Sequence, residues 1–537
     1  MIEVEAHNLL QSFLRLRSGG QTLLGETDPD SAVGLTQSQG DRSSVSASWP
    51  HYLTMARLVA RALRLGRSAL IQTGVAPISH YHPYCFSYLI PVLIWSQPTL
   101  IVAPQWLLTE LQQEVIPQLF ESQAIESYSH KSIIQSEAWP IEPDFQGILL
   151  TTPEAWLSDR LGKKQRFPLN IPTIIDSVDD LETWTRQQLT ACIQPETWTD
   201  LQQQIPDYSH IIREAKIYLT QAIFQRPVNP YNCHLLEQRE QAILEQLYHD
   251  LTEVESSTIP DEWHQFWHQW QAPNQLRWAQ VEREQGTFSL YCSPTEVHST
   301  LSDIWSLQPV VLIGSALDLQ KTAPTYRQSV GLEEITCVKF SPDRNSQLIQ
   351  LYLPSRLPLP NTSRFQGALI EEIRGLLCMS TTIEGLTVLL VEDTPLRTQI
   401  GTVFASEFGS RVQVETTKLD RQGILVTGWE FWRQHQGKLP PPCLLAIATL
   451  PLPSLEHPLV AGRVNHYKQN HQDWFRLYLL PTALNELQRA VAPVRNSQGI
   501  VALFDSRVLH RSYGEQVLAA LTPMARIDYL DTTWFNR

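Results

Sequence analysis

Short apolar runs alternate with amphipathic segments along most of the chain. The apolar residues of 55–66 recur with helical spacing, and 68–74 has the pattern of a strand that ends in a turn. Further short apolar runs, bounded by Pro, Asp or Ser and separated by helical segments, occupy 99–104, 147–153 and 172–177. Because short buried strands that alternate with helices are typical of parallel sheets, we predict an α/β lobe over residues 49–180.

The pattern changes in residues 181–275, which are rich in Gln, Glu, His and Trp. Helical spacing in 209–224 and 235–254 predicts a separate helical insertion. Strand-like runs then return at 308–316, 386–393, 423–428, 443–453, 474–481 and 499–507. We therefore expect residues 276–320 to complete the first lobe and residues 321–537 to form a second α/β lobe.

The N-terminal segment, residues 1–48, does not follow this alternation. Its residues 26–48 are rich in Ser, Gly and Asp and have almost nothing to bury, which indicates a mobile surface insertion. Residues 1–20 lack the basic, apolar and small-residue blocks of a signal peptide, so we do not expect secretion. The most apolar stretch, 89–104, contains polar residues and internal prolines and is too short to span a membrane.

Composition limits the classes of function. A chain of 537 residues with 42% hydrophobic residues buries a large core, and its length suggests roughly two to four domains. The formal net charge of -14 argues against general polyanion binding, so any nucleic-acid site must be a local groove. The seven cysteines are scattered without a CxxC pair, which fits free thiols in a reducing cytoplasm.

The C-terminal third carries an ordered series of motifs. Gly428 is followed after two residues by Phe431 and Trp432, and then by a strand end of Leu-Pro-Leu-Pro at 450–453. A later segment matches a second pattern through Tyr478, Pro481, Gln488, Arg495, Asp505, Arg507, Tyr513 and Gly514. In this order the motifs resemble those of the XPD/DinG family of superfamily 2 DNA helicases.

Upstream segments extend the resemblance to roughly residues 49–180 and 276–537. Residues 310–319 and 339–360 lie where the family has its Ser-Ala-Thr-Leu motif and a proline-rich segment. Residues 174–182 stand at the position of the DEAH box, and 70–80 at the position of the phosphate loop. The resemblance implies two RecA-like parallel-sheet lobes, with the insertion in the place of the family's arch.

The phosphate loop has lost the residues that family members use to hold a nucleotide. With Gly74 as its first glycine, Ser79 stands at the last glycine and His80 at the lysine that neutralises phosphate charge. Tyr81 replaces the hydroxyl residue that binds magnesium, and Pro77 removes a backbone amide. A histidine could substitute for the lysine, but we prefer the interpretation of a packed turn.

The DEAH position has changed in the same way. Asp176 keeps the carboxylate that would hold magnesium, whereas Ser177 replaces the glutamate that would polarise the attacking water. Asp179 and Asp180 add carboxylates nearby. We interpret them as helix-capping or solvated groups rather than as a relocated base.

The last motif in active family members presents two arginines to the nucleotide's phosphates. Here only the second survives, as Arg495, because Ala492 occupies the first position. Arg489 is either a moved cation or a surface arginine, and we prefer the latter. Arg433 and Gln436 stand where the family has a glutamate and an aspartate that couple the nucleotide and DNA sites.

Metal and cluster sites are not expected. The family's iron-sulphur cluster needs four grouped cysteines, but only Cys85 lies between the phosphate loop and the DEAH position. His264 and His268 share a predicted helix face without a third ligand at recognisable spacing, so we expect no metal site.

Two segments could contact DNA. The first contains four tryptophans whose early spacing suits either a stacking platform or, as we prefer, a buried helix face. The second is a basic cluster that we interpret as a solvated loop. Their residues are Trp263, Trp267, Trp270 and Trp278, and Arg160, Lys163, Lys164 and Arg166.

These observations predict a cytoplasmic protein with a helicase fold that binds single-stranded or forked DNA, or a repair protein, without hydrolysing ATP. No catalytic residue or cofactor is assigned. The first alternative is an active ATP-dependent DNA helicase with altered motifs, supported by Asp176 and Arg495, which would use ATP and magnesium. The second is a scaffold that binds only protein, supported by the acidic net charge.

Overall fold

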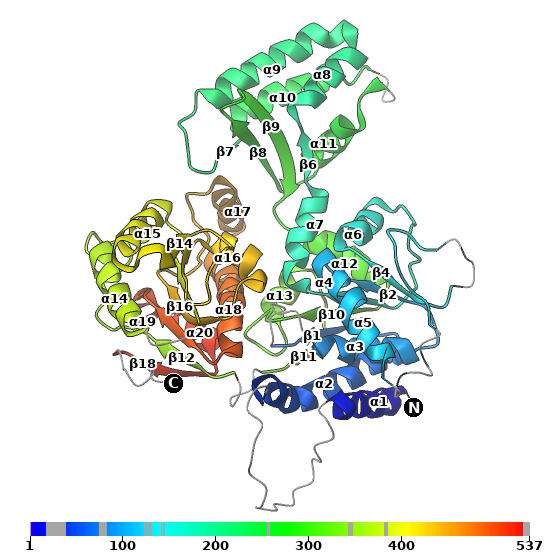
Figure 1. The fold of residues 1–537 in the computed structure, drawn as a ribbon. Helices are drawn as coiled ribbons and strands as arrows, with labels where there is room; N and C mark the ends of the chain where they lie inside the picture. Colours follow the sequence, from blue (N-terminus) through cyan, green and yellow to red (C-terminus); the bar gives the residue numbers. More distant parts are fainter. Residues whose placement is uncertain are drawn as a thin grey trace, which may run out of the picture.

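The computed structural model describes residues 2–17, 39–74, 83–122, 125, 128, 131–140, 142, 145–254, 258–341, 347–380 and 385–529, with only the backbone for 16–17 and 39–49. Two parallel-sheet lobes lie side by side, and a smaller body with an antiparallel sheet stands above them (Figure 1). The predicted α/β class and the two parallel-sheet lobes are confirmed.

Lobe 1 is built on a seven-stranded parallel sheet of order β11-β1-β10-β5-β2-β4-β3. The strands β1, β2, β4, β5 and β10 are buried along their whole length, because helices cover both faces of the sheet. The bounds are β1 Ala69–Gln72, β2 Thr99–Val102, β3 Ile133–Gln135, β4 Ile148–Thr151, β5 Thr173–Asp176, β10 Val310–Gly314 and β11 Thr336–Lys339.

Two hydrophobic clusters separate the helices of lobe 1 by face. One face carries α1 Ile2–Arg17, α2 Gln39–Leu65, η1 Pro83–Cys85, α3 Phe86–Ile94, α4 Gln105–Glu110, η2 Leu111–Val115 and α5 Ile116–Phe120. The other carries α6 Pro153–Gly162, η4 Val178–Asp180, α7 Leu181–Leu189, α12 His298–Leu307 and α13 Pro324–Ser329. The predicted insertion at 26–48 falls partly outside the described residues, and its residues 39–48 are helical, not a loop.

Lobe 2 repeats this architecture with the strand order β14-β15-β13-β16-β17-β12-β18. Its strands are β12 Ile349–Tyr352, β13 Leu386–Leu390, β14 Val412–Val414, β15 Ile424–Thr427, β16 Pro442–Ile447, β17 Ile500–Leu503 and β18 Met524–Ile527. Its helices are α14 Phe365–Ser380, α15 Thr394–Phe408, η7 Gly409–Arg411, α16 Trp429–His435, η8 Gln436–Lys438, α17 Pro458–Gln469, η9 Phe475–Leu479, α18 Leu480–Asn496, α19 Arg507–His510 and α20 Gly514–Leu521.

The expected strand at 474–481 was wrong, because these residues form η9 and the start of α18. Asp473 accepts a hydrogen bond from the backbone amide of Arg476 at the start of this helical segment. Phe475, Leu479 and Leu480 pack on one hydrophobic cluster or are buried beside it. A short apolar run fits a buried helix as well as a strand, so periodicity alone could not separate the two.

The boundary between the lobes lies later than the predicted 320/321. β11 pairs with β1, so lobe 1 continues to Lys339, and lobe 2 begins with β12 at Ile349. The sequence pattern did not reveal this boundary, because β11 is short and its partner β1 lies far away in the sequence.

The insertion is not only helical. It contains a four-stranded antiparallel sheet of order β6-β9-β8-β7, and it extends to residue 294 rather than 275. Along β8 and β9 alternate residues face the helices, which is the period-2 pattern of a half-buried strand. Its elements are β6 Ala191–Ile193, α8 Pro195–Gln204, η5 Pro206–Tyr208, α9 Ser209–Phe224, β7 Cys233–Leu235, α10 Gln238–Asp250, α11 Asp261–Gln271, β8 Gln275–Glu282 and β9 Thr287–Pro294.

The core of the insertion includes the tryptophans of α11. Trp263, Trp267 and Trp270 are at most 4% exposed and pack in one hydrophobic cluster, which confirms the buried-face interpretation. Trp278 lies on β8 instead, stacked on Tyr291 with ring centroids 5.1 Å apart.

The insertion rests on α17 of lobe 2, which lies directly below it (Figure 1). A Cβ atom at Gly462 of α17 would come within 2.6 Å of the end of the Leu276 side chain, so the two elements lie close together here. At the start of α17, His457 packs on Tyr231 with ring centroids 4.4 Å apart. The three bodies are therefore in mutual contact, because the insertion also continues covalently into lobe 1.

Candidate nucleotide and nucleic-acid sites

The carboxyl ends of β1, β5 and β10 form the edge of lobe 1 at which a parallel sheet places its polar residues. Beyond β1, the backbone amides of Thr73 and Gly74 donate to the carbonyls of Gly314 and Ser315 at 2.8 Å. These two amides therefore extend the pairing between β1 and β10. Of the predicted phosphate-loop residues, Ser79 and His80 lie outside the described residues.

Asp176 ends β5 and is only 1% exposed. One carboxylate oxygen accepts hydrogen bonds from the Tyr84 hydroxyl at 3.2 Å and from the Ser177 amide at 2.6 Å. Burial, together with the nearby Asp176, raises the pKa of Tyr84 well above 10, so Tyr84 stays protonated and donates. The carboxylate at the magnesium position is thus tied to η1, the turn that precedes α3.

Ser177 adopts a left-handed backbone conformation with φ of 60°. Its hydroxyl is buried and has no hydrogen-bond partner among the described atoms. A serine hydroxyl is a poor proton acceptor, so this position offers no general base.

Asp179 and Asp180 act differently from their predicted role. Asp179 accepts hydrogen bonds from the Ser315 amide at 2.8 Å, the Ser315 hydroxyl at 2.5 Å and the Ala316 amide at 3.3 Å. Asp180 pairs with Arg489 of lobe 2 at 2.9 Å and makes no side-chain cap on α7. The helix-capping interpretation of Asp180 was therefore wrong, although its side chain remains 42% exposed, whereas Asp179 is bonded within lobe 1.

The interpretation of Arg489 as a surface arginine was also wrong. Its side chain is 15% exposed, and Asp180 and Asp179 outweigh the effect of burial and raise its pKa above the usual range. It is not a free surface arginine but a bridge from α18 to lobe 1. Its partner lies 309 positions away in the sequence, which no local pattern reveals.

Arg495 points into lobe 2. Its guanidinium donates to the carbonyls of Gln347, Leu521, Thr522 and Pro523 at 2.6 to 3.3 Å. Burial lowers the pKa of Arg495 to about 10. This placement differs from the phosphate contact that the resemblance implies, because the four carbonyls already occupy the guanidinium.

Gln488 is also directed within lobe 2, since its amide donates to the Ala520 carbonyl at 3.3 Å. Gln488 and Arg495 thus help to hold α18 against α20 and the turn that follows it.

A second ion pair, between Glu182 of α7 and Arg463 of α17, also joins the lobes. One oxygen of Glu182 on α7 accepts from Arg186 at 2.5 Å and from Arg463 of α17 at 2.6 Å. Arg463 also lies over the Tyr478 ring, 4.0 Å from its centroid. Burial alone would raise the pKa of Glu182, but Arg463 and Arg186 outweigh it and lower the pKa below 4.5. The stability that the ion pairs of Glu182 contribute is fully present above pH 4.5, and it is lost as the pH falls through the lowered pKa of Glu182.

A magnesium nucleotide needs a carboxylate for the metal and cations for the phosphates. Each described residue at this edge that could serve in that donor set has a partner within the protein. Asp176 is bonded to Tyr84, Arg489 is paired with Asp180, and Arg495 is enclosed in lobe 2.

The predicted basic cluster divides into a buried and an exposed part. Arg160 pairs with Asp159 at 2.7 Å and donates to the Phe167 carbonyl, so it is structural. Lys163, Lys164 and Arg166 are exposed at the end of α6. Because α6 runs back along the sheet from the end of β4, they lie away from the edge that faces lobe 2.

Trp106 is a candidate residue that the sequence pattern did not indicate. Among the tryptophans whose side chains the structure describes, it alone is strongly exposed, at 48%. It stands in the first turn of α4, directly after β2, at the carboxyl edge of the sheet. What distinguishes Trp106 is the exposure of its large aromatic side chain. The sequence does not show exposure, so only the structure identifies this residue.

Within the described ranges, His, Cys, Asp and Glu residues do not gather in any group of three or more that could hold a metal ion. The described helices include none that is both long enough and apolar enough to cross a membrane.

Replacement of Arg495 is expected to destabilise lobe 2. In Arg495→Met, buried carbonyls lose their donors, at a cost of roughly 1–3 kcal/mol for each unsatisfied group. Urea unfolding followed by circular dichroism would measure the loss. Arg433→Met is the control, because Arg433 is 49% exposed and 4.0 Å from Glu486. Equal stability of the two variants would contradict the structural role of Arg495.

Similarity to known structures identifies the fold of the chain. No family model and no curated protein sequence matches the chain. An apo structure of XPD matches with a TM-score of 0.55 and 11% identity, over 88% of this chain and 100% of that one. Xpd4 from S. tokodaii matches with 0.56 and 13%, over 89% and 100%, and an XPD helicase with 0.55 and 11%, over 89% and 99%. At these identities the likeness concerns the fold alone, so the chain has the fold of XPD helicases, with two RecA-like lobes and an insertion.

Proposed function

We propose that this chain binds single-stranded or forked DNA across its two helicase-like lobes and does not hydrolyse ATP. The observation that carries the proposal is the Asp180–Arg489 ion pair. It joins lobe 1 to lobe 2 directly, at the edge where a helicase of this fold would hold nucleotide phosphates between the lobes. Arg489 is the α18 cation that faces this edge, and it is already neutralised there.

The ion pairs between the lobes stabilise the observed arrangement of the lobes in the absence of a nucleotide. Asp180 is 42% exposed, so solvent screens its pair with Arg489 and the contribution is on the order of 1 kcal/mol. The Glu182–Arg463 pair is more enclosed, since its side chains are 31% and 15% exposed. Loss of one partner there would leave a partly buried charge unpaired.

DNA binding rests on the fold and on the polar edge of lobe 1. A chain with a net charge of -14 needs contacts other than broad electrostatic attraction. Trp106 offers an exposed aromatic surface of the kind on which bases stack. Thr152 caps α6 at the same edge, where backbone amides at a helix start suit a phosphate. A protein-binding scaffold is the competing function, favoured by the acidic net charge.

The purified protein is expected to show no DNA-stimulated ATP hydrolysis above background. The reason is that the described groups do not fit a magnesium nucleotide, and loss of a key catalytic group costs about two to four orders of magnitude in rate. Phosphate release would be measured with and without single-stranded DNA, for the wild type and for Asp176→Asn. A robust rate that Asp176→Asn abolishes would establish the active helicase instead.

Single-stranded DNA is expected to bind in a salt-dependent manner, and Trp106→Ala to bind about tenfold more weakly, because a stacked base contributes roughly 1–3 kcal/mol. Fluorescence anisotropy of labelled DNA at two salt concentrations would measure both effects. Tyr218→Ala, which removes an aromatic residue 47% exposed on α9, is the control and should bind normally. Absence of binding by the wild type would favour the protein scaffold.

The distance between the lobes is expected to be independent of ATP. Dyes on Cys residues introduced at exposed positions of each lobe would report it by energy transfer. In the double variant Arg463→Gln, Arg489→Gln the lobes should separate, because the two arginine–carboxylate pairs between them are lost. Arg374→Gln, which removes an exposed ion pair within lobe 2, should leave the distance unchanged. An ATP-driven change in the wild type would contradict the proposal.

A further inference from the structure

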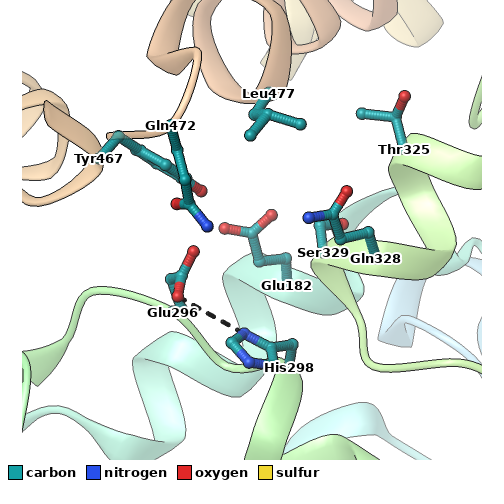
Figure 2. Close-up of a pocket in the computed structure, with 9 residues that line it drawn as sticks. All are labelled: Glu182, Glu296, His298, Thr325, Gln328, Ser329, Tyr467, Gln472 and Leu477. Carbon is teal, nitrogen blue, oxygen red and sulfur yellow. Dashed lines mark ion pairs between the residues drawn. The ribbon is translucent and has the colours of Figure 1, made fainter. Parts of the chain in front are cut away.

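A polar cavity lies where the two lobes meet below the insertion. Its volume is about 140 Å³, and α7 and α13 of lobe 1 and the end of α17 in lobe 2 contribute to its wall. Figure 2 shows the side chains of Glu182, Gln328 and Gln472 converging on the cavity, with Glu296 beside them. Leu477 supplies an apolar surface on the lobe 2 side.

Both carboxylates in the wall lie beside basic side chains. Glu182 accepts from Arg186 and Arg463 through one oxygen only. One oxygen of Glu296 lies 3.6 Å from His298 of lobe 1 and 3.6 Å from His466 of lobe 2. The opposite oxygens have no such ion-pair partner among the described residues. The cavity therefore presents carboxylate oxygens as hydrogen-bond acceptors, which suits a ligand that donates hydrogen bonds.

The volume of the cavity is close to that occupied by a single ring. A protein cavity of about 150 Å³ admits benzene. A pyrimidine base has the same ring size, and polar lining groups can meet its edges. The amides of Gln328 and Gln472 can each donate or accept, and they come from opposite lobes.

We infer that this cavity receives one unstacked cytosine from the bound DNA strand, an inference that rests on the proposed function. The exocyclic amine of cytosine donates to Glu296, a pairing that carboxylates make with this group. Thymine has a carbonyl and a methyl group at the corresponding edge. At Glu296 this carbonyl would face a carboxylate oxygen that cannot donate, so thymine is disfavoured there. The bound base contacts both lobes, because residues of both lobes line the cavity.

The test compares two labelled oligonucleotides with the full chain at one salt concentration. One is an oligothymidylate, and the other carries a single central cytosine in the same sequence. We expect the single cytosine to strengthen binding about tenfold. An oligonucleotide with an abasic position in place of that cytosine should bind no better than the oligothymidylate.

Glu296→Gln is the diagnostic variant. A glutamine amide can donate to the thymine carbonyl, so the preference for cytosine should fall toward unity while the size of the side chain is kept. Glu284→Gln makes the same change of charge at an exposed position in the turn between β8 and β9 and should keep the preference. Gln472→Leu, in an exposed loop of lobe 2, is a second variant that should weaken the preference if Glu296→Gln fails to fold.

The outcomes separate the two proposals. A cytosine preference that Glu296→Gln or Gln472→Leu reduces and Glu284→Gln retains supports the inference. Equal binding of the two oligonucleotides overturns the inference and leaves DNA binding in place. A preference that survives in Glu296→Gln and Gln472→Leu also overturns it, because the base would then be recognised elsewhere. Absence of binding by every oligonucleotide overturns the proposed function and the inference together.

Discussion

Two arginine–carboxylate pairs stabilise the contact between the lobes, and the candidate sites lie beside them. Asp180–Arg489 and Glu182–Arg463 both join the segment just after β5 to helices of lobe 2. Attraction between partly buried charges is stronger than between exposed ones, because less water screens it. The pairs therefore hold α17 and α18 against lobe 1, and this arrangement also forms the cavity whose wall comes from both lobes.

The polar groups at the edge of lobe 1 bond mainly to one another. Strands buried on both faces leave little room for polar side chains except at the strand ends. There Asp179 holds the Ser315 amide and hydroxyl, and Asp176 holds the Tyr84 hydroxyl. Buried donors and acceptors are costly when unpaired, so these contacts stabilise the fold. In the proposed function, groups that serve nucleotide chemistry in an active motor serve packing here.

The sequence predicted the parts of the fold that rest on local pattern. Short apolar runs located β1, β2, β4, β5, β10, β13, β15, β16 and β17, since burial on both faces leaves a continuous apolar signal. The segment at 474–481 has the same signal but is helical, because a short apolar run carries no period. The pairing of Arg489 with Asp180 and the enclosure of Arg495 depend on partners distant in sequence or on backbone carbonyls, which carry no residue signature.

Glu182 links the ion pair between the lobes to the proposed base site. It pairs with Arg463 through one oxygen and lines the cavity, so a base bound there and the contact between the lobes share one side chain. By linkage, any change that weakens the contact should weaken base binding, and a bound base should in turn stabilise the contact. In an ATP-driven motor, nucleotide turnover would alternate the lobe contact and with it the affinity for DNA. Fixed charges in place of a nucleotide would instead keep that affinity constant, which is the behaviour of a static DNA-binding protein.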